Sequence, residues 1–303
     1  RRIGSLQAGE LESASDQLQA VWSVDMPLTA DREGGGLRLV TPPVAFLRYR
    51  EPDTLQLILG PDARGMRRIR STLVTVEPAG EPEPEETWNM LSNLERVEES
   101  WYVEYRGAPA LIVTTVLADK HGVFERKKLR LFSLTADRTR AGSRPLLEVM
   151  TRSRNWYRTC AGVADVNGDG VDDLVSAQPK GLGAGSLWVE AHLTKSGGGF
   201  DAKPRGSEIQ VEEGEICSLA VDLTRDGVVD LVVVEGDDLL VFPLISAPEA
   251  KTVVDSEPGF RIPFDDISSR PRPISAGRDS TVGIGIAGQT KGRMQAVRVV
   301  RFP

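Results

Sequence analysis

The feature that most constrains this chain is a repeat in its middle. The segment CAGVADVNGDGVDDLV, which begins at Cys160, aligns with CSLAVDLTRDGVVDLV, which begins at Cys217. The cysteines are 57 residues apart, as are the first loop aspartates, Asp165 and Asp222. Each copy is a short apolar run, an acidic loop with a glycine, and a second apolar run, which is typical of two strands joined by a hairpin. The sequence therefore predicts an all-β chain of stacked, repeated units.

Weaker copies of the unit lie on both sides. Aligned on the apolar residue after the loop, the copies are spaced by 56, 63, 57 and 51 residues, at Leu55, Leu111, Leu174, Leu231 and Val282. A period in the fifties with about four strands per unit is typical of a β-propeller blade. We therefore predict five blades, with six or seven left open. The expected blade units are 44–80, 101–152, 158–213, 216–265 and 273–303.

The ends of the chain suggest how such a ring would close. The last unit offers only three strands, near 273–276, 281–287 and 295–302, whereas 21–26 and 36–41 are spare strands ahead of the first unit. We expect an N-terminal strand to complete the last blade, because this removes exposed sheet edges. The predicted domains are therefore an N-terminal segment, 1–35, and a single propeller, 36–303.

Helical periodicity is scarce. The best candidate is 87–101, with Thr87 as N-cap and an apolar face, and a weaker one is 10–21. The apolar face of the first consists of Trp88, Leu91, Leu94, Val97 and Trp101. The acidic stretch EPEPEE at 81–86 is interpreted as an extended linker between repeats.

Composition excludes several classes of function. The 303 residues carry a net charge of −7, which argues against nucleic acid, and no apolar run approaches the roughly 20 residues of a membrane helix. A zinc finger needs four Cys or His ligands at close spacing, and neither His121 nor His192 has a Cys or His neighbour at that spacing. We interpret His121 as a solvated turn residue and His192 as a packing residue. Because the chain begins at Arg1-Arg2 without a signal pattern, we expect any targeting peptide to be absent from it.

The first loop carries a calcium-like spacing. Its oxygen-bearing side chains occupy positions 1, 3, 5 and 9, at Asp165, Asn167, Asp169 and Asp173, with Gly170 at position 6 and the carbonyl of Val171 at position 7. Hard oxygen ligands at alternate positions suit Ca²⁺. An EF-hand is disfavoured, because position 12 is Ser176 and strands flank the loop. The alternative is a solvated turn closed by Asx hydrogen bonds.

The second loop is a poorer copy. The aspartates at positions 1, 5 and 9 and the glycine remain, as Asp222, Asp226, Asp230 and Gly227, and Val228 supplies the carbonyl position. Thr224 replaces the asparagine at position 3, and Arg225 adds a competing cation. A weak metal site and a purely structural turn are both open here.

The block from Val163 to Ala177, with its continuation through SLWV at 186–189 to Gly199-Phe200, resembles the FG-GAP/VCBS repeats of integrin-α-like β-propellers. The likeness is specific over 158–241. It implies that the loop between the first two strands of a blade binds structural calcium. The implied ligands are Asp165, Asn167, Asp169, Val171 and Asp173 in loop 1, and Asp222, Asp226, Val228 and Asp230 in loop 2, where Thr224 departs from the pattern.

For three other features we prefer a structural interpretation to a functional one. Cys160 and Cys217 hold the same register on neighbouring inner strands, near or beyond the Cα limit for a disulfide, so buried free thiols are favoured and a disulfide is the alternative. The glycine-rich run 181–185 precedes a strand and is interpreted as a hairpin loop rather than a phosphate site. The tryptophans are expected in blade cores rather than on a sugar-stacking surface; they are Trp88, Trp101, Trp156 and Trp188.

Together these patterns predict a non-enzymatic, calcium-stabilised propeller that binds other proteins, as a scaffold or accessory subunit of a surface or envelope assembly. We expect it outside the cytoplasm, where calcium is plentiful enough to fill such loops. The alternative is a glycan-binding module or a polysaccharide-acting enzyme on the same scaffold, since a fold alone does not decide function.

Overall fold

A computed structural model describes much of the chain in separate stretches. They are 19–26, 29–33, 36–40, 44–50, 54–62, 69–76, 83–94, 96–117, 126–136, 139–154, 159–180, 185–201, 203–212, 217–222, 224, 226–236, 238–263, 272–276, 281–290 and 294–301. Side chains are described for Ile69 and for most of the described residues in 90–261.

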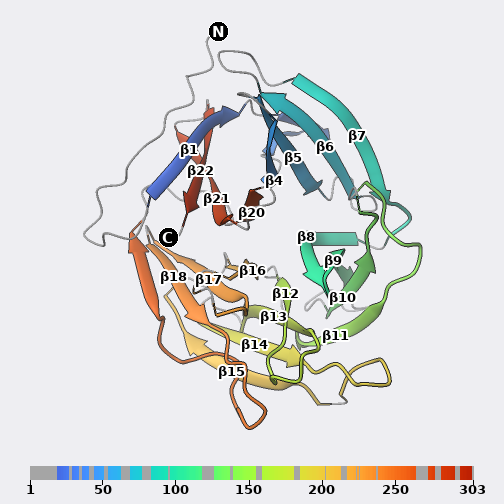
Figure 1. Cartoon of the computed structure of the whole chain (residues 1–303), viewed down its shortest axis with the longest axis vertical. Coiled ribbons are helices and arrows are strands. Elements are labelled where there is room, and N and C mark those ends of the chain that lie inside the picture. The colour runs from blue at the N-terminus through green and yellow to red at the C-terminus, as the bar shows by residue number, and fades with distance from the viewer. Residues whose placement is uncertain are drawn as a thin grey trace. The chain divides into compact units, whose positions relative to one another are not determined.

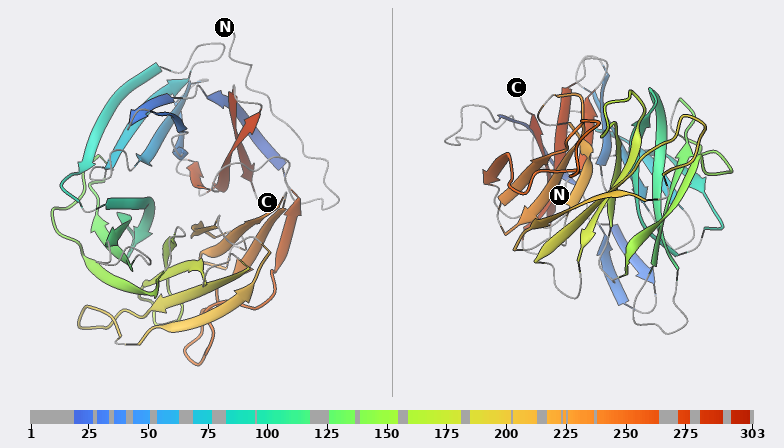
Figure 2. Two further views of the ribbon diagram at one scale, coloured as in Figure 1. Left: turned by 180° about the vertical axis from the view of Figure 1, so that it is seen from behind. Right: turned by 90° about the horizontal axis from the view of Figure 1, so that it is seen from below.

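The chain divides into two compact units. Unit 1 comprises 1–65, 70–88 and 266–303, and unit 2 comprises 66–69 and 89–265. Their strands can be followed in Figure 1 and, from behind, in Figure 2.

Three four-stranded antiparallel sheets belong to unit 2, and we name each after its first strand. The β8 sheet consists of β8 (Arg96–Tyr105), β9 (Ala108–Leu117), β10 (Arg126–Ser133) and β11 (Leu147–Arg154). The β12 sheet consists of β12 (Cys160–Ala164), β13 (Asp173–Pro179), β14 (Ser186–His192) and β15 (Arg205–Gln210). The β16 sheet consists of β16 (Cys217–Val221), β17 (Asp230–Glu235), β18 (Asp238–Pro243) and β19 (Phe260–Pro263).

An eight-stranded sheet and a hairpin account for the remaining strands. Half of the sheet is β4 (Val44–Arg50), β5 (Thr54–Asp62), β6 (Ile69–Val76) and β7 (Glu83–Leu91). The other half is β20 (Arg272–Ala276), β21 (Thr281–Thr290), β22 (Met294–Arg301) and β1 (Gln19–Met26). The halves join through a short parallel pairing of β20 with β4. The hairpin is β2 (Thr29–Glu33) with β3 (Gly36–Val40).

The predicted organisation is therefore confirmed at the level of four-stranded antiparallel sheets. The predicted blade units overlap these sheets and half-sheets, but 44–80 ends before β7 and 101–152 begins within β8. The N-terminal strand completes the last of them, because β1 pairs antiparallel with β22 along its length, from Gln19 opposite Arg301 to Met26 opposite Gln295.

The two predicted helices are not confirmed. The span 87–101 forms the end of β7 and the start of β8, separated by a turn in which Asn93 has a φ of 59°. Strand β8 is buried on both faces and bulges between Val97 and Glu99, so its apolar residues lose the alternation of an ordinary strand and imitate a helical spacing. The acidic linker prediction is also wrong from Glu83 onward, where β7 begins.

The weaker helix, 10–21, overlaps β1 from Gln19, which is a strand, and its remainder lies outside the described residues. Among the residues that the structure describes there is no helix, and so none that could cross a membrane.

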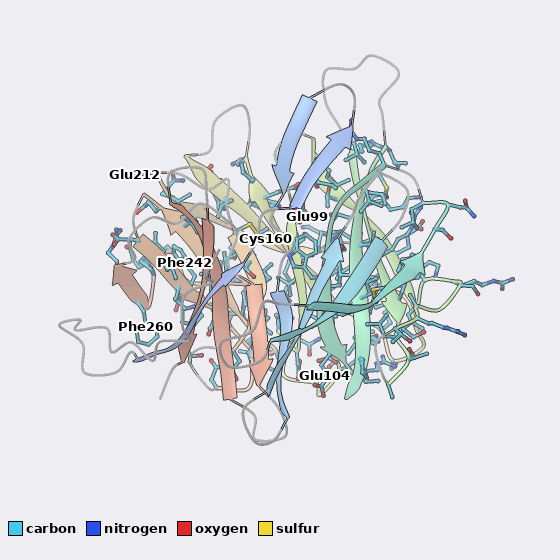
Figure 3. The ribbon with its side chains drawn as sticks, turned by 90° about the horizontal axis from the view of Figure 1, so that it is seen from above. Glu99, Glu104, Cys160, Glu212, Phe242 and Phe260 are labelled. Atoms are coloured by element: carbon cyan, nitrogen blue, oxygen red, sulfur yellow. A yellow bond between two sulfur atoms is a disulfide. The ribbon has the colours of Figure 1, made fainter. Side chains whose placement is uncertain are left out.

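The core of unit 2 lies where its three sheets meet. The first strands β8, β12 and β16 contact one another. Completely or almost completely buried side chains from all three sheets form one cluster, including Trp101, Leu131, Val175, Leu219 and Phe242. In Figure 3, Cys160 and Phe242 lie among the packed strands, whereas Phe260, half exposed, lies at the outer side. The burial of Trp101 agrees with its predicted core position.

Candidate metal centre

Loop 1 joins β12 to β13, the first two strands of the β12 sheet. Asp165 directly follows β12, and Asp173 is the first residue of β13. Between them the chain turns sharply, and Gly170 has a φ of 79°, a conformation that side chains other than glycine rarely adopt. The predicted position of the loop, between the first two strands of a repeat, is confirmed.

Asp165 organises the loop. Its Oδ1 accepts hydrogen bonds from the backbone N–H groups of Asn167, Gly168 and Asp169, at 3.3, 2.7 and 3.1 Å. Its Oδ2 accepts a further one from the N–H of Gly170 at 2.7 Å. One carboxylate therefore gathers four consecutive amides, as in an extended Asx turn.

The next two ligand candidates repeat this pattern on a smaller scale. Asn167 Oδ1 accepts from the N–H of Asp169 at 2.9 Å, and Asp169 Oδ1 accepts from the N–H of Val171 at 2.8 Å. Val171 thus takes part through its N–H group. The side chains at positions 1, 3 and 5 all point to backbone amides of the loop.

Asp173 is buried and holds the loop to its sheet. Its Oδ1 accepts from the N–H of Thr194 at 2.7 Å, and its Oδ2 accepts from the N–H of Val166 at 3.3 Å. Burial raises the pKa of this carboxyl to about 6; the two hydrogen bonds lower it, and the charges of Asp169 and Asp165 raise it further. Three loop carboxyl groups are therefore close enough to interact electrostatically.

These residues fit a calcium site in chemistry but not in arrangement. Carboxylate and amide oxygens are the ligands that Ca²⁺ prefers. Within the described stretches, however, no group of three or more His, Cys, Asp or Glu side chains is gathered closely enough to hold a metal ion. The loop oxygens point to backbone amides, so the conformation corresponds to the Asx-closed turn, and metal binding would require the carboxylates to converge.

Loop 2 joins β16 to β17 and has a similar hydrogen-bonding arrangement. Asp222 Oδ2 accepts from the N–H of Gly227, and Asp226 Oδ1 accepts from the N–H of Val228, both at 2.9 Å. Gly227 has a φ of 90°, and the last aspartate, Asp230, is buried. Arg225, the expected competing cation, lies outside the described residues.

Position 3 distinguishes the two loops. Thr224 donates its hydroxyl to Asp230 Oδ1 at 3.3 Å and its N–H to Asp230 Oδ2 at 2.9 Å. In loop 1 the equivalent Asn167 instead accepts through its Oδ1, from the N–H of Asp169. The threonine is thus engaged with the buried aspartate.

Loop 1 also contacts both neighbouring sheets. The N–H of Arg106, in the turn between β8 and β9, donates to Asp172 Oδ2. From the segment after β18, Ser246 donates its hydroxyl to the carbonyl oxygen of Asp165 at 2.6 Å. Neither Arg106 nor Ser246 was predicted to contact the loop. No local sequence pattern indicates these contacts, because the two residues lie 66 and 81 positions away from their partners along the chain.

Cys160 and Cys217 form a disulfide between β12 and β16, with their Cα atoms 5.9 Å apart. The preference for free thiols is therefore wrong, because these strands approach more closely than neighbouring strands were expected to. Gly162 allows this approach, since a Cβ there would overlap the carbonyl oxygen of Leu219 on β16. Both cysteines are fully buried.

The remaining predicted residues have mixed outcomes. His192 is buried and its ring meets that of Phe200 edge to face, with centroids 6.0 Å apart, as expected for a packing residue. Trp188 is partly buried. His121, the side chains of Trp88 and Trp156, and the glycines of the 181–184 run lie outside the described residues.

Comparisons with known proteins add little. No family model matches the chain, and no curated protein does. A chain of the yeast heterotrimeric Nup82-Nup159-Nup116 nucleoporin complex is 8% identical with a TM-score of 0.36, over 86% of this chain and 73% of that one. Trypanosoma rangeli sialidase is 10% identical with a TM-score of 0.39, over 99% of this chain and 60% of the sialidase chain. We base no argument on these similarities.

Proposed function

We propose that the chain is a non-enzymatic β-propeller of the FG-GAP type, stabilised by calcium. It acts outside the cytoplasm as a protein-binding scaffold or accessory subunit of a larger surface or envelope assembly.

The arrangement of first strands supports the propeller. In unit 2, β8, β12 and β16 contact one another, as the innermost strands of successive blades do. In unit 1, the first strands β4 and β20 pair in parallel, which is the relative direction that innermost strands share around a ring. The β1–β22 pairing supports closure of the last of five blades by an N-terminal strand.

The observation that carries the proposal is the Cys160–Cys217 disulfide beside two acidic loops of one pattern. Disulfides persist in oxidising compartments and are rare in the cytosol. Outside the cytoplasm calcium is also abundant enough to occupy loops of modest affinity. The bridge and the loops therefore favour the same location, and the protein-binding role follows from the resemblance to integrin-α-like propellers.

Chelation tests the calcium part of the proposal. We expect millimolar Ca²⁺ to raise the melting temperature by several degrees over protein in a chelator, because an ion that binds only the folded state stabilises it by mass action. Asp169→Ala should abolish that difference, because it removes a central carboxylate of loop 1.

Asp201→Ala is the matched control. Asp201 is an exposed aspartate outside both loops, and its nearest cationic partner, Lys195, is 3.9 Å away. The control should retain the full calcium effect. Identical melting of the unmutated protein with calcium and with chelator would contradict the proposal.

A further inference from the structure

One face of the β12 sheet carries a row of buried polar side chains. Ser176 and Gln178 lie on β13, and Glu190 and His192 lie on β14. Ser176 is directly opposite Glu190, and the neighbouring pair places His192 opposite Leu174. All four side chains belong to residues that are at most 6% exposed. We call these four residues the buried polar row.

The row faces the β8 sheet. The opposite face of the β12 sheet contains Cys160 and its register partner Ala177, and it meets the β16 sheet through the disulfide to Cys217. Because side chains alternate along a strand, the residues that flank Ala177 point the other way. There, Thr159 donates its hydroxyl to the Gln178 side chain at 3.3 Å and its N–H to Glu98 of β8 at 3.3 Å.

Each member of the row has one buried atom without a hydrogen-bond partner. These atoms are Ser176 Oγ, Gln178 Nε2, Glu190 Oε2 and His192 Nε2. The Nε2–Oε2 separation between His192 and Glu190 is 3.5 Å, longer than an ordinary N–H···O hydrogen bond. Buried polar groups in native proteins are nearly always satisfied, so four such atoms along one face indicate polar partners other than these side chains.

Other contacts hold these side chains in position. Glu190 Oε1 accepts from the indole N–H of Trp188 at 2.8 Å, and Gln178 Oε1 accepts from Thr159. The ring of His192 packs against Phe200. Glu190, Gln178 and His192 are therefore each held at one part of the side chain, while a second polar atom remains available for a ligand.

The available atoms define the chemistry of that ligand. A carboxylate oxygen accepts, an amide nitrogen donates, and a hydroxyl or an imidazole nitrogen can do either, depending on its proton. The partner must therefore both donate and accept, and it must fit between two packed sheets. We propose that the buried polar row binds a cluster of ordered internal water molecules between the β8 and β12 sheets.

Oxygen-17 relaxation dispersion of water tests this directly, because it detects water molecules held inside a protein for longer than bulk exchange allows. We expect a dispersion from the unmutated protein and a clear loss of amplitude in Ser176→Ala, which removes one hydroxyl without adding volume. The urea midpoint of this variant should also fall, since the remaining waters lose a partner.

Ser207→Ala is the control. Ser207, on β15, is also buried, but its Oγ already accepts from the N–H groups of Val253 and Val254. This variant should lose stability and keep the full dispersion amplitude. An unmutated protein without dispersion, or an amplitude unchanged by Ser176→Ala, would overturn the proposal. Should Ser176→Ala fail to fold, a high-resolution crystal structure of the unmutated protein decides, and a dry row overturns it.

Discussion

Loops 1 and 2 share a hydrogen-bonding arrangement and differ in their contacts at position 3. Both begin with an aspartate that accepts from the N–H five residues later, and both end with a buried aspartate at the start of the next strand. At position 3, Asn167 accepts from its loop, whereas Thr224 donates to Asp230. The comparison teaches that the first and last aspartates hold both loops in shape, and that the loops differ in whether the side chain at position 3 accepts from its own loop or donates to the buried aspartate.

The largest expected effect concerns the buried aspartate that ends each loop. Asp173→Ala removes the acceptors of Thr194 and Val166, and Asp230→Ala removes those of both Thr224 groups. Because hydrogen bonds to charged groups are strong and both aspartates are buried, each variant should lose about 2–4 kcal/mol of unfolding free energy. Urea denaturation without calcium measures this. If only one of the two variants lost stability, the last aspartates of the two loops would not have the same role.

Exchanging the residues at position 3 sharpens the comparison of the two loops. Thr224→Asn supplies an amide oxygen and removes the hydroxyl bonded to Asp230, so the calcium-dependent rise in melting temperature should grow by a few degrees. The reverse change, Asn167→Thr, should weaken calcium binding about tenfold, which corresponds to about 1.4 kcal/mol. Calorimetric titration of both variants checks these values, and unchanged binding in both would show that position 3 is not the determinant.

A further expected effect is a pH dependence of stability. The pKa of Asp173, about 6, lies above its ordinary value of 3.8, so the folded state holds this proton more tightly than the unfolded state. Without calcium, stability from this group should therefore decline as pH rises from about 4 to about 6 and level off above. Asp173→Asn should remove that part of the slope in urea midpoints measured across this range. A slope that persists unchanged in the variant would contradict the assignment.

Much of the fold could be predicted from repetition and alternation. The 57-residue offset identified the β12 and β16 sheets, their loops and the equivalent cysteines, because short hairpins of alternating residues are local features. The first half of β8 was assigned to a helix, because burial on both faces and a bulge near Glu99 removed its alternation.

The packing between sheets could not be predicted. The disulfide depends on the close approach of Gly162 to the backbone of Leu219, and the support of loop 1 depends on Ser246. The buried polar row was not predicted, because no pattern in the sequence shows that this face of the β12 sheet is covered. Contacts between distant segments leave no periodic trace in a sequence.

The pairing of β1 with β22 has a consequence for the order of folding. Gln19 lies opposite Arg301, 282 positions further along the chain. During synthesis β1 is made long before β22, so the edge of β1 that pairs with β22 stays unpaired until then. Contacts of such long range slow folding and prolong the exposure of an unpaired strand edge.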